Sequence, residues 1–308
     1  MKTGRTLIMF MVLLPVFCML AGGCTMQKDP YTLAVEAYGR GDYAAAEPYF
    51  TAAVESGDNR NEVLIGHAYN LLQLGQLPDA ISVFLDAQTG IEKQEDLISV
   101  KKVMLSAYLT EQNYAGAARV SEELARLVPN QFEANDYLIM SSQIRADLYE
   151  MRGDSELLAE ELNKLIELKP YAADEFVRLY ELNAQDPDIT KRLKTADSFI
   201  MYTTGHAAYM TDYTPVITIL LDAADMTERT TYEHDREYYH TKAEEFMDKA
   251  TELGVPEETL LKFKITIAER RGKMELAYKL LGVYLNHCPD DALAVKEREY
   301  LENRLGLD

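Results

Sequence analysis

The stretch Tyr38-Gly39-Arg40-Gly41-Asp42-Tyr43 opens a pattern of glycine, small and aromatic residues that returns along this chain of 308 residues. Within the first copy the pattern continues with Ala46, Phe50 and Ala53. The same residue types stand 34 positions later, at Gly75, Ala80, Phe84 and Ala87. A fixed period of this length indicates an internal structural repeat.

Three further copies carry the same landmarks. The third is marked by Tyr108, Asn113, Tyr114, Ala117 and Pro129. The fourth is marked by Ala146, Tyr149, Gly153, Asp154, Leu162 and Pro170. The last is marked by Ala268, Gly272, Ala277, Leu281 and Pro289. The copies span residues 27–60, 61–94, 98–131, 139–172 and 258–291.

This pattern resembles the tetratricopeptide repeat (TPR), a unit of about 34 residues in which a turn joins two helices. The resemblance implies an all-α fold: a right-handed superhelical solenoid of TPR-like helix-turn-helix pairs with a C-terminal capping helix. Residues 292–308 are expected to form that capping helix, with a polar outer face, because the end of a stack has no further neighbour.

The residue types agree with such a fold on physical grounds. Glycine adopts the left-handed backbone that ends a helix at little cost. It stands at the expected turn in four copies, as Gly41, Gly75, Gly153 and Gly272. The aspartate that follows the turn in two copies can accept hydrogen bonds from the free amides of the next helix. The alanines beyond it let two helices approach to about 8–10 Å.

Between residues 173 and 257 the pattern fades, and we interpret this segment as two degenerate helical pairs. Ile189, Leu193, Ala196 and Ile200 recur at helical spacing. The stretch 199–221 is ambiguous, because Val216-Ile217-Thr218-Ile219 has the β-branched residues that favour a strand.

The N-terminal residues 1–23 have the character of a secretory signal peptide, with basic residues before an apolar run of about 14 residues. The run ends in Leu20-Ala21-Gly22-Gly23-Cys24, which resembles the lipobox of bacterial lipoproteins. That resemblance implies a lipid group on Cys24, and residues 24–29 then form a short tether. The alternative is an ordinary signal peptide in which the cysteine stands by chance. We expect an extracytoplasmic protein anchored at the outer face of the cytoplasmic membrane, or at the outer membrane of a diderm.

The chain is strongly acidic, with 51 Asp and Glu against 31 Lys and Arg and a formal charge of −20. Such a surface repels nucleic acid and anionic lipid, so we expect no nucleic-acid partner and a membrane attachment that depends on the lipid. Of three cysteines, Cys18 lies in the signal peptide and Cys24 in the lipobox. Cys288 is left without a disulfide partner, and beside His287 at a helix end it is interpreted as an inert, packed thiol.

No motif for catalysis or phosphate binding is present in the sequence. The densest ionisable cluster is Glu233-His234-Asp235 with His240. His234 and His240 are about 240° apart around a helix, so they do not face one metal ion together. We interpret the cluster as a solvated helix start, and we expect no enzyme activity, no cofactor and no metal.

In the family that the repeats resemble, the first helices of the pairs line a concave groove for peptides or partner helices. By register this groove is expected to contain Tyr31, Val35, Tyr38, Ile65, Tyr69, Leu72, Lys102, Ser106 and Leu109, followed by Gln143, Asp147 and Glu150. It would change from apolar and aromatic to acidic, which suits an amphipathic helix or apolar peptide with basic residues at one end. Family members that clamp a C-terminal carboxylate have Lys and Asn at the positions of Tyr31 and Val35, so no such clamp is expected. The alternative for each groove residue is a place in the core.

Two classes of function are compatible with these features. The first is a non-catalytic, lipid-anchored scaffold that binds envelope proteins or peptides through its groove. The second is an extracytoplasmic lipoprotein that captures glycans or peptides. The chain has no Trp, on which sugars commonly stack, but its 20 Tyr leave the second class open.

Overall fold

The computed structural model describes residues 28–58 and 60–307, and within these ranges all regular structure is helical. The expected signal peptide, the lipidation at Cys24 and most of the tether lie outside the described residues. The chain forms two compact units that divide after Ala87. The all-α fold predicted from the repeats is confirmed.

The first unit contains two pairs of helices, and within each pair the second helix packs back along the first. The helices are α1 (Pro30–Gly39), α2 (Tyr43–Glu55), α3 (Asn61–Gln73) and α4 (Leu77–Ala87). α2 also packs against α3, which joins the two pairs.

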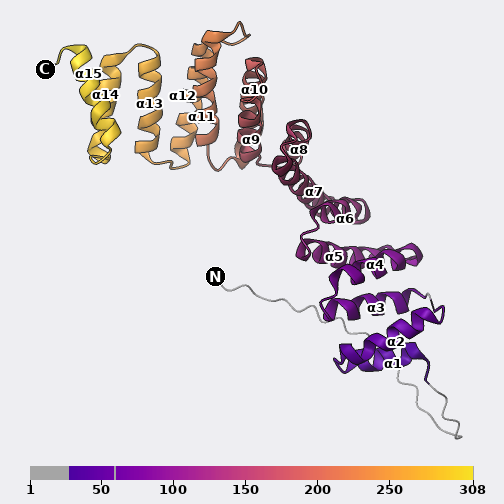
Figure 1. Ribbon diagram of the computed structural model, residues 1–308. Helices are drawn as coiled ribbons and strands as arrows, with labels where there is room; N and C mark the ends of the chain where they lie inside the picture. The colour runs from indigo at the N-terminus through magenta and orange to yellow at the C-terminus, as the bar shows by residue number, and fades with distance from the viewer. Residues whose placement is uncertain (1–27, 59, 308) are drawn as a thin grey trace, which may run out of the picture. The chain divides into compact units, whose positions relative to one another are not determined.

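The second unit continues the same arrangement, with neighbouring helices packed side by side (Figure 1). Its helices are α5 (Gln94–Thr110), α6 (Tyr114–Leu127), α7 (Gln131–Arg152), α8 (Ser155–Leu168), α9 (Ala173–Asn183), α10 (Ile189–Gly205), α11 (Thr214–Met226), α12 (Arg236–Glu252), α13 (Glu257–Arg270), α14 (Met274–His287) and α15 (Ala292–Leu305). Three short 3₁₀ turns lie between them: η1 (Gln88–Gly90), η2 (Ala207–Tyr209) and η3 (Thr227–Arg229). No helix in this part or in the described first unit is both long and apolar enough to cross a membrane.

The turn between the helices of a pair has the left-handed residue that the sequence predicts. The φ angle is 77° at Gly41, 74° at Gly75, 70° at Gly153 and 68° at Gly272. In the third copy Gln112 takes this position with a φ of 56°. A side chain in this conformation is strained relative to glycine, so Gln112 marks a locally weaker turn.

The residue after the turn caps the following helix. Asp42 accepts a hydrogen bond of 3.1 Å from the backbone N–H of Ala45. Asn113 and Asp154 make the equivalent bond at the start of α6 and α8. Lys273 stands at this position before α14, where it provides no side-chain hydrogen bond to the helix.

Small and aromatic repeat residues form the core of each unit. In the first unit Ala46 and Ala80 are fully buried, and the rings of Phe50 and Phe84 lie at the same helical spacing beyond them with almost no exposure. Burial of one such aromatic side chain contributes about 1.5–3 kcal/mol. The largest core of the second unit lies among α9 to α13.

The segment with strand propensity is helical. Residues 216–219 belong to α11, which packs against α9, α10, α12 and α13. Val216 and Ile217 are fully buried, because α11 has neighbours on several sides. A β-branched run is compatible with a helix when burial outweighs its propensity.

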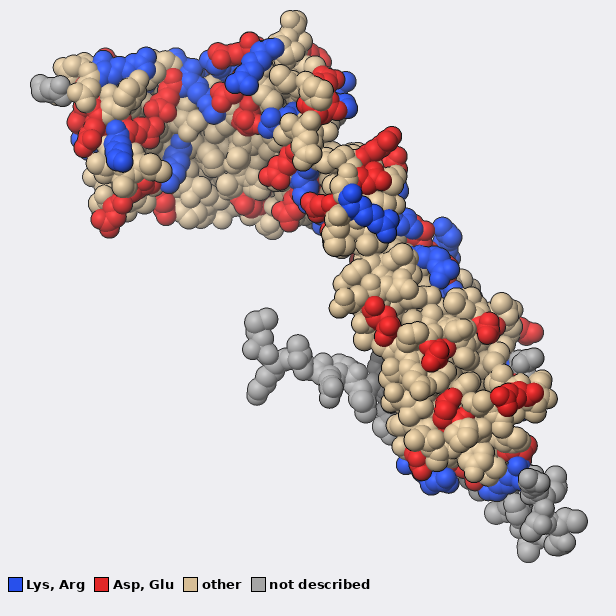
Figure 2. Space-filling model, viewed as in Figure 1, with Lys and Arg blue, Asp and Glu red and all other residues tan. Residues whose placement is uncertain are grey.

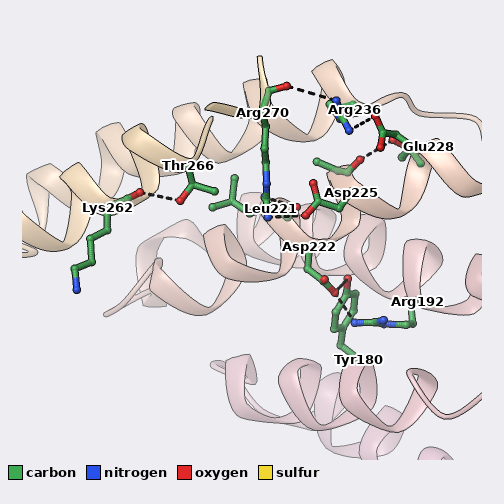
Figure 3. A network of polar contacts seen from close by, with 12 residues as sticks. Tyr180, Arg192, Leu221, Asp222, Asp225, Glu228, Arg236, Lys262, Thr266 and Arg270 are labelled. Carbon is green, nitrogen blue, oxygen red and sulfur yellow. Dashed lines mark hydrogen bonds and ion pairs between the residues drawn. The ribbon is translucent and has the colours of Figure 1, made fainter. Parts of the chain in front are cut away.

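A polar network joins α11 to the helices on either side of it (Figure 3). Asp222 accepts a hydrogen bond of 2.8 Å from the hydroxyl of Tyr180 on α9 and pairs with Arg192 on α10. Asp225, one turn further along, pairs with Arg270 on α13 at 2.6 Å. Three successive helical pairs are therefore connected through one helix.

The last helix, α15, covers the end of the stack. Ala294 and Leu301 are buried against the stack, as a capping helix requires. On the outside, however, Leu293 is 79% exposed and Tyr300 is 57% exposed. Lys296, Glu299 and Arg304 are exposed on the same helix, so its solvent side carries both polar and apolar residues.

Candidate partner-binding face

The six groove positions predicted in the first two copies lie on α1 and α3, which pack against each other. Each of them is half-buried, with one side in the core and the other toward solvent. We call this set the α1–α3 face: Tyr31, Val35, Tyr38, Ile65, Tyr69 and Leu72. Each of these residues thus belongs partly to the core and partly to the surface where the groove is predicted.

Tyr31 is held in place by contacts on three sides. Its ring centroid lies 6.3 Å from that of Phe50, and the guanidinium of Arg60 lies 5.3 Å from the same ring. Its hydroxyl donates a long hydrogen bond of 3.5 Å to the backbone carbonyl of Glu62. Burial raises the pKa of Tyr31 above its ordinary value, so the phenol stays neutral.

The other two tyrosines of the face also rest on aromatic partners. Tyr38 meets Tyr43 edge-on with ring centroids 5.2 Å apart, and Tyr69 meets Phe84 edge-on at 5.4 Å. Burial raises the pKa of both phenols. Side chains that are already fixed lose little conformational entropy when a partner binds, so this arrangement favours binding.

Charge around the α1–α3 face is mostly negative. Residues 61–92, which include α3 and α4, contain no Lys or Arg. The basic residues of the described first unit are Lys28, Arg40 and Arg60, all next to α1 or at the start of α3. Figure 2 shows isolated Asp and Glu over this unit, with its Lys and Arg gathered at the α1 end.

A partly buried polar cluster joins α3 to α2. Glu47 on α2 accepts hydrogen bonds from the side chain of Asn70 and from the ring of His67, both at 2.8 Å. Asn70 is fully buried and also donates to the carbonyl of Tyr43. The repeat pattern does not identify this cluster, although a polar residue inside the apolar run of α3 is a signal for it.

The third-copy positions belong to the second unit. Lys102, Ser106 and Leu109 lie on α5 and are exposed. The amino group of Lys102 pairs with Glu133 on α7 at 2.8 Å, and that bond raises the pKa of Lys102. The structure thus gives Lys102 an intramolecular partner.

The predicted acidic end of the groove is less acidic than its sequence indicates. Asp147 and Glu150 on α7 are exposed, as is Gln143. Arg178 on α9 pairs with Asp147 at 3.2 Å and with Glu150 at 2.7 Å. One cation thus offsets part of the charge of two carboxylates, and both carboxylates remain exposed.

The histidine cluster near α12 separates into two environments. The ring of His234 stacks on Tyr238 with centroids 3.7 Å apart. His240 is fully buried, neither ring nitrogen has a hydrogen-bond partner among the described residues, and burial lowers its pKa. In the same residues there is no group of three or more His, Cys, Asp or Glu side chains arranged to hold a metal ion.

Several solved structures are similar to this chain over most of its length. No family model and no curated protein matches the sequence. The solved structure of Naa15/Naa10 bound to HypK-THB matches with a TM-score of 0.49 and 11% identity, over 89% of this chain and 38% of that chain. A TPR protein from Parabacteroides merdae ATCC 43184 matches with a TM-score of 0.32 and 13% identity, over 88% and 97%. The P58(IPK) TPR domain matches with a TM-score of 0.31 and 12% identity, over 90% and 98%.

The adjacent helical pairs, with a left-handed turn in the repeat copies, give the chain a TPR-like fold. It spans 38% of the length of the Naa15/Naa10 chain that it matches. A fold of this kind forms extended surfaces from successive repeats.

Proposed function

We propose that this protein is a non-catalytic, lipid-anchored adaptor that binds envelope proteins or peptides through the α1–α3 face. The observation that carries the proposal is that all six face residues are apolar or aromatic and still partly open to solvent. Isolated apolar residues on a surface are ordinary, but a contiguous set on two packed helices is typical of an interaction site.

The chemistry of the face favours one kind of partner. An amphipathic helix would place apolar side chains against Tyr31, Tyr69 and their neighbours. The scarcity of Lys and Arg in residues 61–92 favours basic residues at the end of the partner that lies over α3. We therefore expect an amphipathic or apolar segment with a basic end.

The adaptor function is tested by photo-crosslinking in cells, from a photoreactive amino acid at Tyr69 or Leu72. Tyr49 on α2 is a matched control, since it is also a tyrosine, is 39% exposed and is not part of the α1–α3 face. Glu160 on α8 is an exposed control in the second unit. We expect one discrete protein adduct from the face and none from the controls. Absence of adducts from Tyr69 and Leu72 in well-expressing cells would contradict the proposal.

The anchor is a separate part of the proposal and rests on the lipobox-like residues 20–24. Two acyl chains on Cys24 give stable membrane attachment, whereas one chain gives only reversible binding. Cys24→Ala is expected to release the protein into the periplasm or the medium. If the variant stays with the membrane after a salt wash, lipidation is not what holds the protein there.

The alternative of small-ligand capture is favoured by one depression in the second unit. It has a volume of about 460 Å³ and lies between η3 and the start of α12. Thr230, Thr231 and Tyr232 line it, and the Tyr232 hydroxyl donates a hydrogen bond of 2.8 Å to Asp197. A glycan array probed with the purified protein tests this class, and reproducible sugar binding would support it over the adaptor.

A further inference from the structure

A groove in the second unit lies between α12 and α14, with α13 beneath it. We call it the α12–α14 groove. Its volume is about 420 Å³, and ligand pockets in proteins commonly measure about 300–1,000 Å³. α12 and α14 are the second helices of their pairs, whereas the α1–α3 face and the other predicted groove positions lie on first helices. This groove is therefore a different surface from the one predicted by the repeats.

The middle of the groove is apolar. Met247 on α12 and Ile267 on α13 line it and are almost fully buried. Leu276 and Leu280 line it from α14, and Leu276 is 45% exposed although its neighbours form a well-packed core. An apolar side chain inserted here would cover Leu276 and gain about 25 cal/mol for each Å² of apolar surface that is buried.

One end of the groove is cationic. Arg271 and Lys273 line both the groove and an adjoining depression, which Arg236 and Arg270 also line. Asp235 and Glu237 also line this depression, so its lining has a formal charge of +2 in a chain whose formal charge is −20. A segment that approaches this end with a negative charge would meet a favourable local field.

Three of these four cations already have intramolecular partners. Arg270 pairs with Asp225, and Arg236 pairs with Glu228 and donates to the carbonyl of Arg270 (Figure 3). Arg271 pairs with Glu244 at 2.6 Å and also with Glu237.

Lys273 is different, because it forms no ion pair with any residue that the structure describes, and the same is true of Lys264 on the groove wall. The opposite wall carries Glu244, which is held by Arg271, and Asp248. Asp248 forms no ion pair among the described residues either, so the unpaired charges of the groove are those of Lys273 and Lys264 against that of Asp248.

We propose that the α12–α14 groove is a second binding surface, which takes a partner peptide segment with an apolar side chain next to a carboxylate. The apolar side chain would cover Leu276 and Leu280, and the carboxylate would pair with Lys273. This preference is opposite in charge to that of the α1–α3 face. Each unit of the chain then holds a partner of its own kind.

Two labelled peptides test the proposal on the purified full chain. One is fluorescein-labelled Gly-Ser-Leu-Leu-Glu-Glu-Gly-Ser, and the other has Lys in place of both Glu residues. Fluorescence anisotropy at low salt is expected to show saturable binding of the acidic peptide, and binding of the basic peptide at least about tenfold weaker, the effect of about 1.4 kcal/mol. No saturable binding of the acidic peptide, or equal binding of the two, would overturn the proposal.

A pair of charge reversals on or next to α14 locates the site. Lys273→Glu is expected to weaken binding of the acidic peptide about tenfold or more. Lys279→Glu makes the same change of charge at an exposed position that does not line the groove, and is expected to leave the affinity within about twofold. Equal loss in both variants would show a general field effect and no site.

Two further variants guard against loss of structure. Lys264→Glu changes the groove wall within α13. Like Lys273→Glu, it is expected to weaken binding of the acidic peptide. Leu276→Ser removes the exposed apolar contact and is expected to weaken the binding of both peptides. The melting temperature of each variant is measured beside the titrations. At least one groove variant is expected to lose affinity while it keeps the melting temperature of the original chain, and the absence of any such variant would contradict the proposal.

Discussion

The side-chain amide of Asn70 donates a hydrogen bond of 2.8 Å to a carboxylate oxygen of Glu47, so the first helix of the second pair is tied to the second helix of the first pair. The same separation of 23 residues recurs in the second unit, where Ser141 donates to the carbonyl of Ala118 and Arg145 pairs with Glu122. Neighbouring pairs are thus joined by polar contacts at one register as well as by apolar packing.

Asn70→Ala is expected to destabilise the first unit. The substitution leaves Glu47 and the carbonyl of Tyr43 without the amide that they share. Loss of a buried hydrogen-bonding partner costs about 1–3 kcal/mol. Urea unfolding followed by circular dichroism measures the change. Gln73→Ala, at an exposed position on the same helix, is the control and is expected to change stability by less than about 0.5 kcal/mol. Equal effects in both variants would refute the role of the Asn70 bond.

Gln112→Gly is expected to stabilise the second unit. The left-handed backbone at Gln112 costs a residue with a side chain about 1–2 kcal/mol. The greater conformational entropy of glycine in the unfolded chain offsets about half of that gain. We therefore expect the free energy of unfolding to rise by about 0.5–1 kcal/mol. The reciprocal change, Gly153→Ala, is expected to cost a similar amount. A loss of stability in Gln112→Gly would mean that the glutamine side chain makes a compensating contact.

Lys273→Asp is expected to raise stability while it removes the positive end of the α12–α14 groove. The backbone at Lys273 has φ −84° and ψ 61°, close to φ −90° and ψ 73° at the capping residue Asp42. An aspartate there can accept from the N–H of Leu276, and such a cap contributes about 0.5–2 kcal/mol. On the same sample, the melting temperature should rise and the affinity for the acidic peptide should fall. Parallel loss of both would show that Lys273 has a structural role.

The pH dependence of stability is expected to change in Glu269→Gln. Burial, together with the nearby carboxyl of Glu297, raises the pKa of Glu269 from 4.5 to about 7. The folded state therefore keeps a proton that the unfolded state loses, so this group stabilises the fold at low pH and the contribution declines as pH rises between 4.5 and about 7.

Glutamine imitates the protonated carboxyl at every pH. The melting temperature of the variant should equal that of the original chain at about pH 4.5 and exceed it above about pH 7.5. Melting curves over this range check the prediction, with Glu299→Gln, an exposed position on α15, as the control. A constant difference at all pH values would mean that Glu269 does not titrate in this interval.

Most of the fold follows from short-range signals in the sequence. Gly41 and Gly153 close the turns, and Asp42 and Asp154 cap the helices that follow, because these effects involve residues that are close in the chain. The six residues of the α1–α3 face were found by register alone. Their partial burial depends on Phe50 and Phe84, which the same register also identified.

The features that the sequence did not reveal depend on segments without a repeat. Arg178 lies in α9, where the pattern fades, so nothing in the sequence placed it beside Asp147 and Glu150. The α12–α14 groove has the same origin, since α12 also lies in the degenerate segment. The helix over residues 216–219 depends on burial by four neighbours, which local propensity does not contain.

The left-handed turns have a consequence for how the protein responds to force. Each turn closes with backbone hydrogen bonds over a few residues, as from Asp42 to Ala37 and from Asp154 to Tyr149, so a pair of helices is complete within one short stretch of chain. When tension pulls along such an array, each junction between neighbouring pairs bears the same force. The weakest junction therefore opens first. A released pair of about 34 residues lengthens the chain by about 110 Å. The molecule would then extend in steps, with the remaining pairs still folded, and would act as a tether whose length increases under strain.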